Sequence, residues 1–263
     1  KNINYITNDA SISLIFTSKK YLGKIEGLNI KTTFKIVLNN SYINDNRYNS
    51  IEKIINSICA NNFKESVKDG NSSIAFILYT TGTTGPKKGV MLSHTNLSEA
   101  TLNINKFMRI GSSAIESLPM RLSHSFGFAR LRCIFDVGGT VILENGFLRP
   151  EKILFNMKLH KANAISSVPA GFSILLDYYK AQFEKICPQI RYIEIGSAFM
   201  RKNHKDMLIK LCPNARICMH YGLTEASSQV YTKNLRHNTS IATCDIKVSN
   251  HKVFIAVRNV RHL

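Results

Sequence analysis

The chain has 263 residues, 44% of them hydrophobic, and a formal net charge of +18. This length and apolar content suit one large domain or two small ones and argue against wholesale disorder. The charge suits polyanionic ligands, but the lysines are scattered and form no basic stripe between aromatic residues, so we favour ordinary solvated lysines and expect no nucleic-acid partner.

The six cysteines include no Cys-x-x-Cys pair and no His–Cys cluster at zinc spacing. They are expected to be small apolar residues in a reducing compartment, without a structural metal. No apolar run reaches the roughly 18 residues of a membrane span, and the N-terminus lacks the apolar core of a signal peptide. We therefore expect a cytoplasmic protein without a transmembrane segment. The first residue is Lys1 rather than Met, which suggests a piece of something longer.

The first third of the chain predicts short strands and one helix. Strands are expected at residues 11–17 and 34–38, with a turn-rich segment between them at 19–27. Residues 39–50 are rich in Asn, Ser and Asp and predict a loop or linker. Apolar residues recur at helical spacing after that loop, which predicts an amphipathic helix over residues 51–60.

An apolar run at residues 74–79 leads directly into a loop of hydroxyls, glycines and lysines at residues 80–89. Glycines allow backbone N–H groups to turn toward phosphate oxygens, threonine hydroxyls donate hydrogen bonds, and lysines supply charge. The order is not that of a Walker P-loop, because Lys88 stands after Lys87 where that motif has Ser or Thr. The alternative is a flexible surface loop. The predicted phosphate-binding residues are Thr80, Thr81, Gly82, Thr83, Thr84, Gly85 and Lys88.

Strand-like and helix-like segments alternate from residue 89 onward. The expected strands are residues 89–93, 114–118, 139–143, 164–168, 191–195 and 215–219, and the expected helices are 95–110, 129–135, 150–160, 170–181 and 201–211. This alternation predicts an α/β fold with βαβ crossovers on a largely parallel sheet. In such sheets ligands bind beyond the carboxyl ends of the strands, and small, hydroxylic and charged residues collect at those ends here.

The second strong motif is His220-Tyr221-Gly222-Leu223-Thr224-Glu225. A tyrosine offers a flat face to an adenine ring, a glycine lets the backbone pass closely, a threonine can bond a phosphate oxygen, and a glutamate can hold Mg²⁺. The alternative is a strand end followed by an ordinary helix cap. Beside the phosphate loop, we favour a nucleotide site.

Weaker motifs follow other predicted strands. Gly196, Ser197 and Ala198 suit a ligand-binding strand end, although Gly-Ser-Ala is also ordinary turn chemistry. His124 is a candidate for the wall of a carboxylate pocket, and the segment ending at Gly171 is a candidate for the acyl pocket.

The phosphate loop, with Tyr-Gly-Leu-Thr-Glu downstream of it, resembles the adenylate-forming (AMP-binding) superfamily of acyl-CoA synthetases, peptide-synthetase adenylation domains and luciferases. One departure is visible, because the family most often has proline just before its second lysine, where this chain has Lys87. The resemblance runs from about Tyr5 to about Val260 and is greatest to bacterial fatty-acid or carboxylate CoA ligases. It implies layered, largely parallel sheets with flanking helices, as in the N-terminal domain of acyl-CoA synthetases, here truncated.

The resemblance also implies a reaction and its ligands. A carboxylate, expected to be a fatty acid, attacks the α-phosphate of ATP to give an acyl-adenylate and pyrophosphate, and coenzyme A or a carrier thiol then displaces AMP. Positioning and charge neutralisation dominate such chemistry. In this scheme Thr81, Lys88 and Thr224 contact phosphates, Glu225 holds Mg²⁺ and Tyr221 contacts adenine.

Parts of the family have no counterpart in these residues, namely the ribose-binding aspartate motif, the hinge, and the small C-terminal domain with its adenylation lysine. We therefore expect residues 1–263 to form one partial large domain that retains ATP binding, with weak or undetectable adenylation by the chain alone. Two alternatives stay open. The chain could be a non-catalytic nucleotide- or acyl-binding relic, or a piece of a peptide-synthetase adenylation domain.

Overall fold

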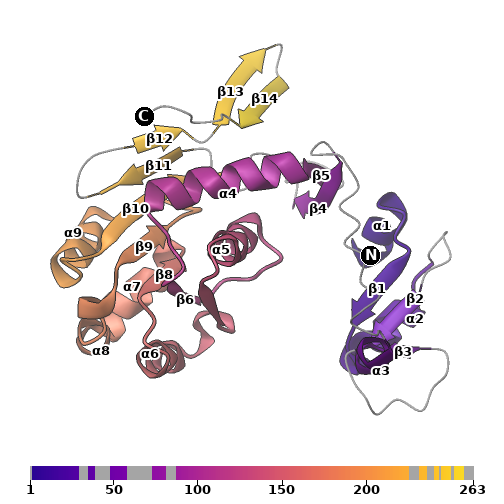
Figure 1. Ribbon diagram of the computed structural model, residues 1–263, viewed down its shortest axis with the longest axis horizontal. Coiled ribbons are helices and arrows are strands. Elements are labelled where there is room, and N and C mark those ends of the chain that lie inside the picture. The colour runs from indigo at the N-terminus through magenta and orange to yellow at the C-terminus, as the bar shows by residue number, and fades with distance from the viewer. Residues whose placement is uncertain are drawn as a thin grey trace. The chain divides into compact units, whose positions relative to one another are not determined.

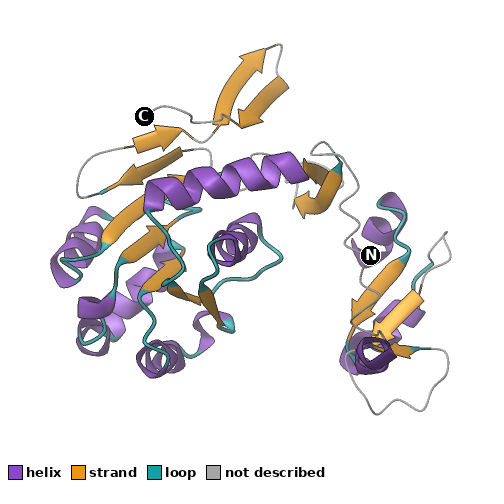
Figure 2. Cartoon of the chain, in the orientation of Figure 1, coloured by secondary structure: helices purple, strands orange, loops and turns teal. Residues whose placement is uncertain are grey.

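The computed structural model describes residues 2–29, 35–38, 48–57, 73–80, 87–224, 231–235, 240–242, 244–249 and 252–257. The chain divides into two compact units. The first contains residues 1–70 and 79–89, and the second contains residues 71–78 and 90–263. Figure 1 labels the elements and Figure 2 separates helices, strands and loops by colour.

The first unit is built on a three-stranded parallel sheet in the order β1-β2-β3. Its elements are α1 (Asn2–Asp9), β1 (Leu14–Thr17), η1 (Lys19–Tyr21), α2 (Leu22–Glu26), β2 (Lys35–Leu38), β3 (Asn49–Ser50) and α3 (Ile51–Ser57). The two predicted strands and the helix α3 are confirmed. The predicted turn-rich segment at 19–27 is instead helical over η1 and α2. Tyr21, Leu22 and Ile25 stand at helical spacing, and Ile25 is buried.

Tyr79 belongs to the first unit and binds its first helix. The Tyr79 hydroxyl donates to Asp9 Oδ2 at 2.6 Å, and its ring meets that of Tyr5 edge-on with centroids 6.4 Å apart. Burial and the hydrogen bond to Asp9 raise the pKa of Tyr79 to about 12.

Strands β4 (Ile74–Thr80) and β5 (Lys88–Ser93) pair as a two-stranded sheet. In the sequence, β4 precedes the predicted phosphate loop and β5 follows it. Helix α4 (His94–Met108) begins at the cap residue Ser93. The Asn96 N–H donates to Ser93 Oγ and the Ser93 N–H donates to Asn96 Oδ1, both at 3.1 Å, so each residue satisfies a free backbone donor of the first turn. The predicted helix over residues 95–110 is therefore confirmed, with a start one residue earlier.

The second unit is organised by a seven-stranded sheet in the order β12-β11-β10-β9-β8-β6-β7. Five of these strands are mutually parallel: β6 (Ile115–Leu118), β7 (Thr140–Leu143), β8 (Ala164–Ser167), β9 (Tyr192–Ile195) and β10 (Arg216–Tyr221). The two antiparallel strands are β11 (Tyr231–Asn234) and β12 (Ser240–Ala242). Strands β13 (Cys244–Ser249) and β14 (Lys252–Val257) pair antiparallel in a separate two-stranded sheet. The predicted parallel α/β sheet is confirmed.

Helices connect the parallel strands and cover both faces of the sheet (Figure 1). They are α5 (Ser125–Asp136), α6 (Pro150–Leu159), α7 (Pro169–Tyr178), α8 (Lys180–Glu184) and α9 (Lys202–Leu211), with short 3₁₀ turns η3 (Gly146–Leu148) and η4 (Cys187–Gln189). The helix predicted over residues 170–181 is two helices, α7 and α8, because Tyr179 leaves the helical conformation between them.

The two faces of the sheet differ in chemistry. Side chains of α6 to α9 pack with Ile165, Ile193, Ile195 and Ile217 in a large apolar cluster. Helices α4 and α5 pack on the other face in a smaller cluster that includes Tyr192 and Cys218. The second face also carries the buried charges described below. None of the helices within the described residues is both long and apolar enough to cross a membrane.

Candidate functional site

A depression of about 570 Å³ lies at the carboxyl ends of β9 and β10. Such a volume is within the ordinary range of small-molecule pockets, about 300–1,000 Å³. Two short segments that sequence analysis predicted to bind a nucleotide meet here. The lining residues are Ser197, Ala198, Phe199, Lys205, Met219, His220, Tyr221, Gly222 and Leu235. The lining combines aromatic and aliphatic side chains with one ammonium group, which suits a flat ring that carries an anionic substituent.

The turn after β9 is shaped by His220. A Cβ added at Gly196 would overlap the His220 ring, so only glycine lets β9 pass at this distance. Ser197 then adopts a left-handed conformation with φ of 71°, which a residue other than glycine adopts at a cost. This close backbone approach places Ser197 and Ala198 at the wall of the pocket.

A buried network of charges lies under the pocket on the α4 and α5 face of the sheet. Arg130, from α5, donates from Nε to Glu116 Oε1 at 3.0 Å and from Nη2 to Glu116 Oε2 at 2.6 Å. Its Nη1 is 2.7 Å from Glu194 Oε2, and Glu194 Oε1 is 2.8 Å from His220 Nδ1. The Tyr192 hydroxyl donates to Glu116 Oε2 at 2.6 Å. Arg130, Glu116 and Glu194 have no exposed surface.

The network keeps Arg130 and Glu194 ionised despite their burial. Burial alone would lower the pKa of Arg130, but the carboxylates of Glu116 and Glu194 outweigh it and raise that pKa well above its ordinary value. Burial alone would raise the pKa of Glu194, but the Arg130 guanidinium and the hydrogen bond with His220 outweigh it, and the net shift is downward. Burial raises the pKa of the nearby Cys133 and Cys218 thiols to about 12, so these thiols stay protonated.

His220 joins this network to the pocket. The His220 ring contacts Glu194 through Nδ1 and packs edge-on against the Phe126 ring, with ring centroids 4.2 Å apart. Because His220 also lines the pocket, the network fixes the orientation of a pocket side chain. Sequence analysis assigned no site role to Arg130, Glu116 or Glu194. The available signal was the presence of charged residues inside apolar strands and a helix, since such residues need partners when buried.

The other predicted site residues fall in three groups. Thr81, Gly82, Thr83, Thr84, Gly85 and Glu225 lie outside the described residues. Thr80 and the exposed Lys88 lie in the first unit, while Thr224 follows the pocket strand β10 in the second. The roles predicted for all of these residues stay predictions.

The predicted acyl-pocket residues lie apart from the lining of this depression. His124 is exposed just before α5, and Gly171 is buried in α7, where an added Cβ would overlap the Phe147 ring and Ser167 Oγ. A second depression, of about 610 Å³, lies at the carboxyl ends of β6 and β7 and is lined by residues 119–122 and 143–148. Neither His124 nor Gly171 is among the lining residues of that depression.

A metal ion has no complete ligand set among the described residues, where no group of three or more His, Cys, Asp or Glu side chains is placed to hold one. The predicted Mg²⁺ ligand, Glu225, lies outside this part of the chain.

Comparison with known proteins gives a family match over nearly the whole chain. A family model described as AMP-binding enzyme matches residues 1–259. Acyl-CoA synthetase 7 of Caenorhabditis elegans is 27% identical over 237 residues, which are 85% of this chain and 43% of that protein. Bacitracin synthase 3 of Bacillus licheniformis is 29% identical over 195 residues, 72% of this chain and 3% of that protein. The chain thus spans less than half the length of these curated relatives.

Solved structures share the fold. An anthranilate CoA ligase in complex with anthranoyl-AMP superposes with a TM-score of 0.80 at 17% identity, over 95% of this chain and 49% of that one. A long-chain-fatty-acid-CoA ligase from Archaeoglobus fulgidus superposes with a TM-score of 0.76 at 19% identity, over 96% of this chain and 52% of that one. At these identities the likeness establishes the architecture, a layered α/β arrangement with a parallel sheet.

Proposed function

Because the chain belongs to the AMP-binding enzyme family of adenylate-forming ligases, we propose that it forms the nucleotide-binding part of an enzyme that activates a carboxylic acid with ATP. The depression at the ends of β9 and β10 carries this proposal. It brings together residues 197–199 and 219–222, which are separate in the sequence. Among them, Ser197, Ala198 and residues 220–222 were predicted to contact the nucleotide.

In the proposed site, adenine lies against Tyr221 and the backbone of Ser197 and Ala198. The pocket supports this placement, because Tyr221 offers an exposed ring and Ser197 and Ala198 supply an accessible strand end. The hydroxyls and lysine of the phosphate loop, Thr81, Thr83, Thr84 and Lys88, contact the β- and γ-phosphates as pyrophosphate leaves. Glu225 would hold Mg²⁺, and the bound ion would neutralise part of the negative charge of the phosphates.

The proposed reaction is in-line attack of a substrate carboxylate oxygen on the α-phosphorus of ATP. A new bond forms between the carboxylate oxygen and phosphorus, the bond to the bridging oxygen breaks, and pyrophosphate departs with that electron pair. The chain's own residues contribute position and charge, because a carboxylate is already a nucleophile and needs no base. A thiol then attacks the acyl carbon and releases AMP.

For the substrate we propose a fatty acid and for the acceptor coenzyme A. The match to acyl-CoA synthetase 7, which covers 85% of this chain, supports an acyl substrate and coenzyme A as the acceptor. The choice of a fatty acid rests on the resemblance described in the sequence analysis. A second candidate, adenylation within a peptide synthetase with a carrier-bound thiol, is supported by the match to bacitracin synthase 3. Assays of carboxylate-dependent exchange of pyrophosphate into ATP separate the two candidates. Exchange stimulated by fatty acids supports the first, and exchange stimulated by amino acids supports the second.

The nucleotide site is tested by replacing its aromatic residue. We expect Tyr221→Ala to raise the dissociation constant for Mg-ATP about tenfold, because stacking on an aromatic ring contributes roughly 1–3 kcal/mol per base. Isothermal titration calorimetry on the full chain measures this.

Tyr178→Ala is the matched control, since Tyr178 is also a surface tyrosine (79% exposed against 57% for Tyr221) but lies on α7 outside the pocket. We expect the control to change the constant less than twofold. Equal constants for the two variants would remove Tyr221 from the site, and failure of the unmodified chain to bind Mg-ATP would contradict the proposed function itself.

A further inference from the structure

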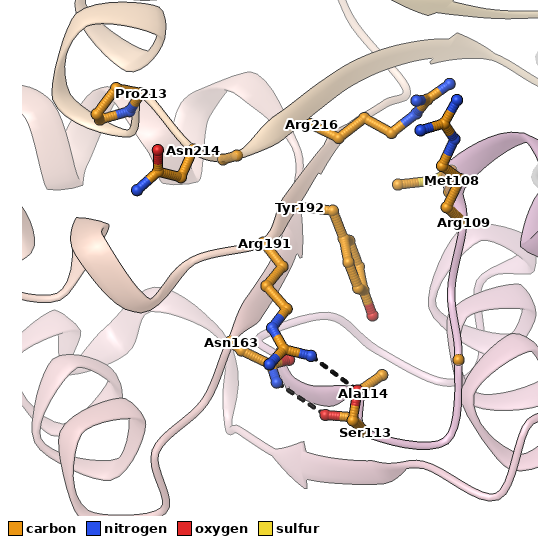
Figure 3. Close-up of a pocket in the computed structure, with 12 residues that line it drawn as sticks. Met108, Arg109, Ser113, Ala114, Asn163, Arg191, Tyr192, Pro213, Asn214 and Arg216 are labelled. Carbon is orange, nitrogen blue, oxygen red and sulfur yellow. Dashed lines mark hydrogen bonds between the residues drawn. The ribbon is translucent and has the colours of Figure 1, made fainter.

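A separate pocket of about 520 Å³ lies at the opposite, amino-terminal edge of the same sheet. Its lining comes from the end of α4 and from the residues that precede or begin β6, β8, β9 and β10. Figure 3 shows its side chains. The nucleotide site proposed above lies at the carboxyl ends of β9 and β10, so these two strands run from one pocket to the other.

The lining of this pocket is strongly basic. It includes the guanidinium groups of Arg109, Arg191 and Arg216 together with the amides of Asn163 and Asn214, and no Asp or Glu is among the described residues that line it. In Figure 3 the side chains of Arg109 and Arg216 extend toward the same corner. Like charges that share a pocket repel each other unless an anion compensates them.

Two of the arginines are held in place by neighbouring groups that carry no charge. Arg191 Nη1 donates to Ser113 Oγ at 2.8 Å, and Asn163 Nδ2 donates to the Ser113 carbonyl at 2.8 Å (Figure 3). The Arg216 guanidinium lies 5.1 Å from the centroid of the Phe107 ring, and its buried Nε has no hydrogen-bond acceptor within the described part of the chain. A donor that is oriented and unsatisfied is suited to a ligand, because leaving it unpaired is costly.

The carboxylates in the described part of the chain do not neutralise these arginines. Within the described ranges, Arg109, Arg191 and Arg216 form no ion pair. One residue of the lining, Tyr192, donates a hydrogen bond to the Glu116 carboxylate. Glu116 is already paired with Arg130 at 2.6 Å. The overall charge of +18 does not by itself account for this pocket, since the lysines are scattered along the sequence whereas three arginines line one pocket.

We propose that this pocket binds a phosphate dianion, either free phosphate or the phosphate group of a small organic ester, at a site distinct from the proposed nucleotide site. Guanidinium groups match phosphate oxygens in paired hydrogen bonds, and the amides of Asn163 and Asn214 supply further donors.

The affinity for inorganic phosphate tests the proposal by equilibrium dialysis of the full chain at constant ionic strength. The double variant Arg191→Gln/Arg216→Gln is expected to bind at least tenfold more weakly, because it loses charged hydrogen bonds. The control Lys158→Gln/Lys185→Gln removes the same amount of charge from exposed positions on and after α6 and α8 and is expected to change the affinity less than twofold. Equal losses in the two double variants would reduce the effect to net charge and overturn the proposal.

A second measurement does not depend on the folding of any variant. Phenylglyoxal modifies accessible arginines, and peptide mass spectrometry reads each position. We expect phosphate to protect Arg109 and Arg191 at concentrations that leave the exposed Arg121, at the carboxyl edge of the sheet, unprotected. Uniform protection or none would overturn the site. Tighter protection by phenyl phosphate than by inorganic phosphate assigns the site to an ester, and equal protection assigns it to free phosphate.

Discussion

At the scale of single residues, Glu194 links the charge network to the candidate site, because it contacts both Arg130 and His220. We expect Glu194→Gln to lower the free energy of unfolding by about 2 kcal/mol, since it removes the charged acceptor that Arg130 and His220 share, while Arg130 keeps its pairing with Glu116. Chemical denaturation at pH 7 measures the change.

The pH dependence provides an independent readout of the same residue. The folded-state pKa of Glu194 lies below its ordinary value of 4.5, so its contribution is fully present above that value and is lost as pH falls through the folded pKa. Stability should therefore fall less steeply below pH 4.5 in Glu194→Gln than in the unmodified chain. The exposed Glu184 is the control, and Glu184→Gln is expected to stay within about 0.5 kcal/mol. An equally small effect of Glu194→Gln would contradict the proposed strength of the network.

Sequence reasoning singled out two segments that meet in the structure at the pocket, but it did not predict the buried charge network next to the pocket. Residues 196–198 and 220–222 were predicted because strand ends in a parallel sheet share one edge. Arg130, Glu116 and Glu194 come from α5, β6 and β9, and their pairing depends on strand order and helix packing, which no local pattern encodes.

At the scale of elements, a hydrogen-bond chain joins α7 to α9. His204 contributes Nδ1 at 3.1 Å from Ser173 Oγ and Nε2 at 3.0 Å from Asp177 Oδ1. The three residue types are those of a hydrolytic triad, but the Ser173 hydroxyl donates to the Pro169 carbonyl of its own helix at 3.1 Å. A hydroxyl that donates its proton to a carbonyl of its own helix is not activated as a nucleophile. We therefore interpret these hydrogen bonds as a structural clamp between α7 and α9.

We expect His204→Ala to lower the free energy of unfolding by about 1–3 kcal/mol, because His204 is buried and its loss leaves polar partners unsatisfied. Urea denaturation followed by circular dichroism measures this. His160→Ala is the control, since His160 is exposed after α6. A clamp role would be abandoned if the two variants were equally stable.

Local patterns predicted most elements of the second unit but not its strand order. Apolar runs bounded by Gly, Pro and Asn located β6 to β10, and the several possible cap residues over 93–98 located the start of α4 to within one residue. The break between α7 and α8 was missed because residues 170–181 keep their apolar spacing across Tyr179. Strand β7 lies outside β6 at the sheet edge, which only long-range pairing decides.

At the scale of the whole molecule, the chain covers 43% of acyl-CoA synthetase 7. By resemblance to the family, we expect the lysine of the adenylation step to lie outside the matched residues. We therefore expect these 263 residues to bind Mg-ATP without detectable carboxylate-dependent exchange of labelled pyrophosphate into ATP. Calorimetry and the exchange assay measure the two properties on one preparation.

The two measurements separate the interpretations of the chain. Binding without exchange supports a nucleotide-binding part that needs further residues for turnover. Robust exchange would show that the matched residues are sufficient and would contradict this prediction. The first unit carries Thr80 and Lys88, and the second carries the depression at β9 and β10.

The buried charges on one face of the sheet also act as a check on strand pairing during folding. In β9, Glu194 faces the charge network, while its neighbours Ile193 and Ile195 face the opposite apolar cluster. A slip of one residue would turn Glu194 into that cluster and remove it from Arg130, so the misregistered sheet would bury an uncompensated carboxylate among apolar side chains. In a wholly apolar strand the same slip would bury no charge. The network therefore favours one register among several that would bury similar amounts of hydrophobic surface.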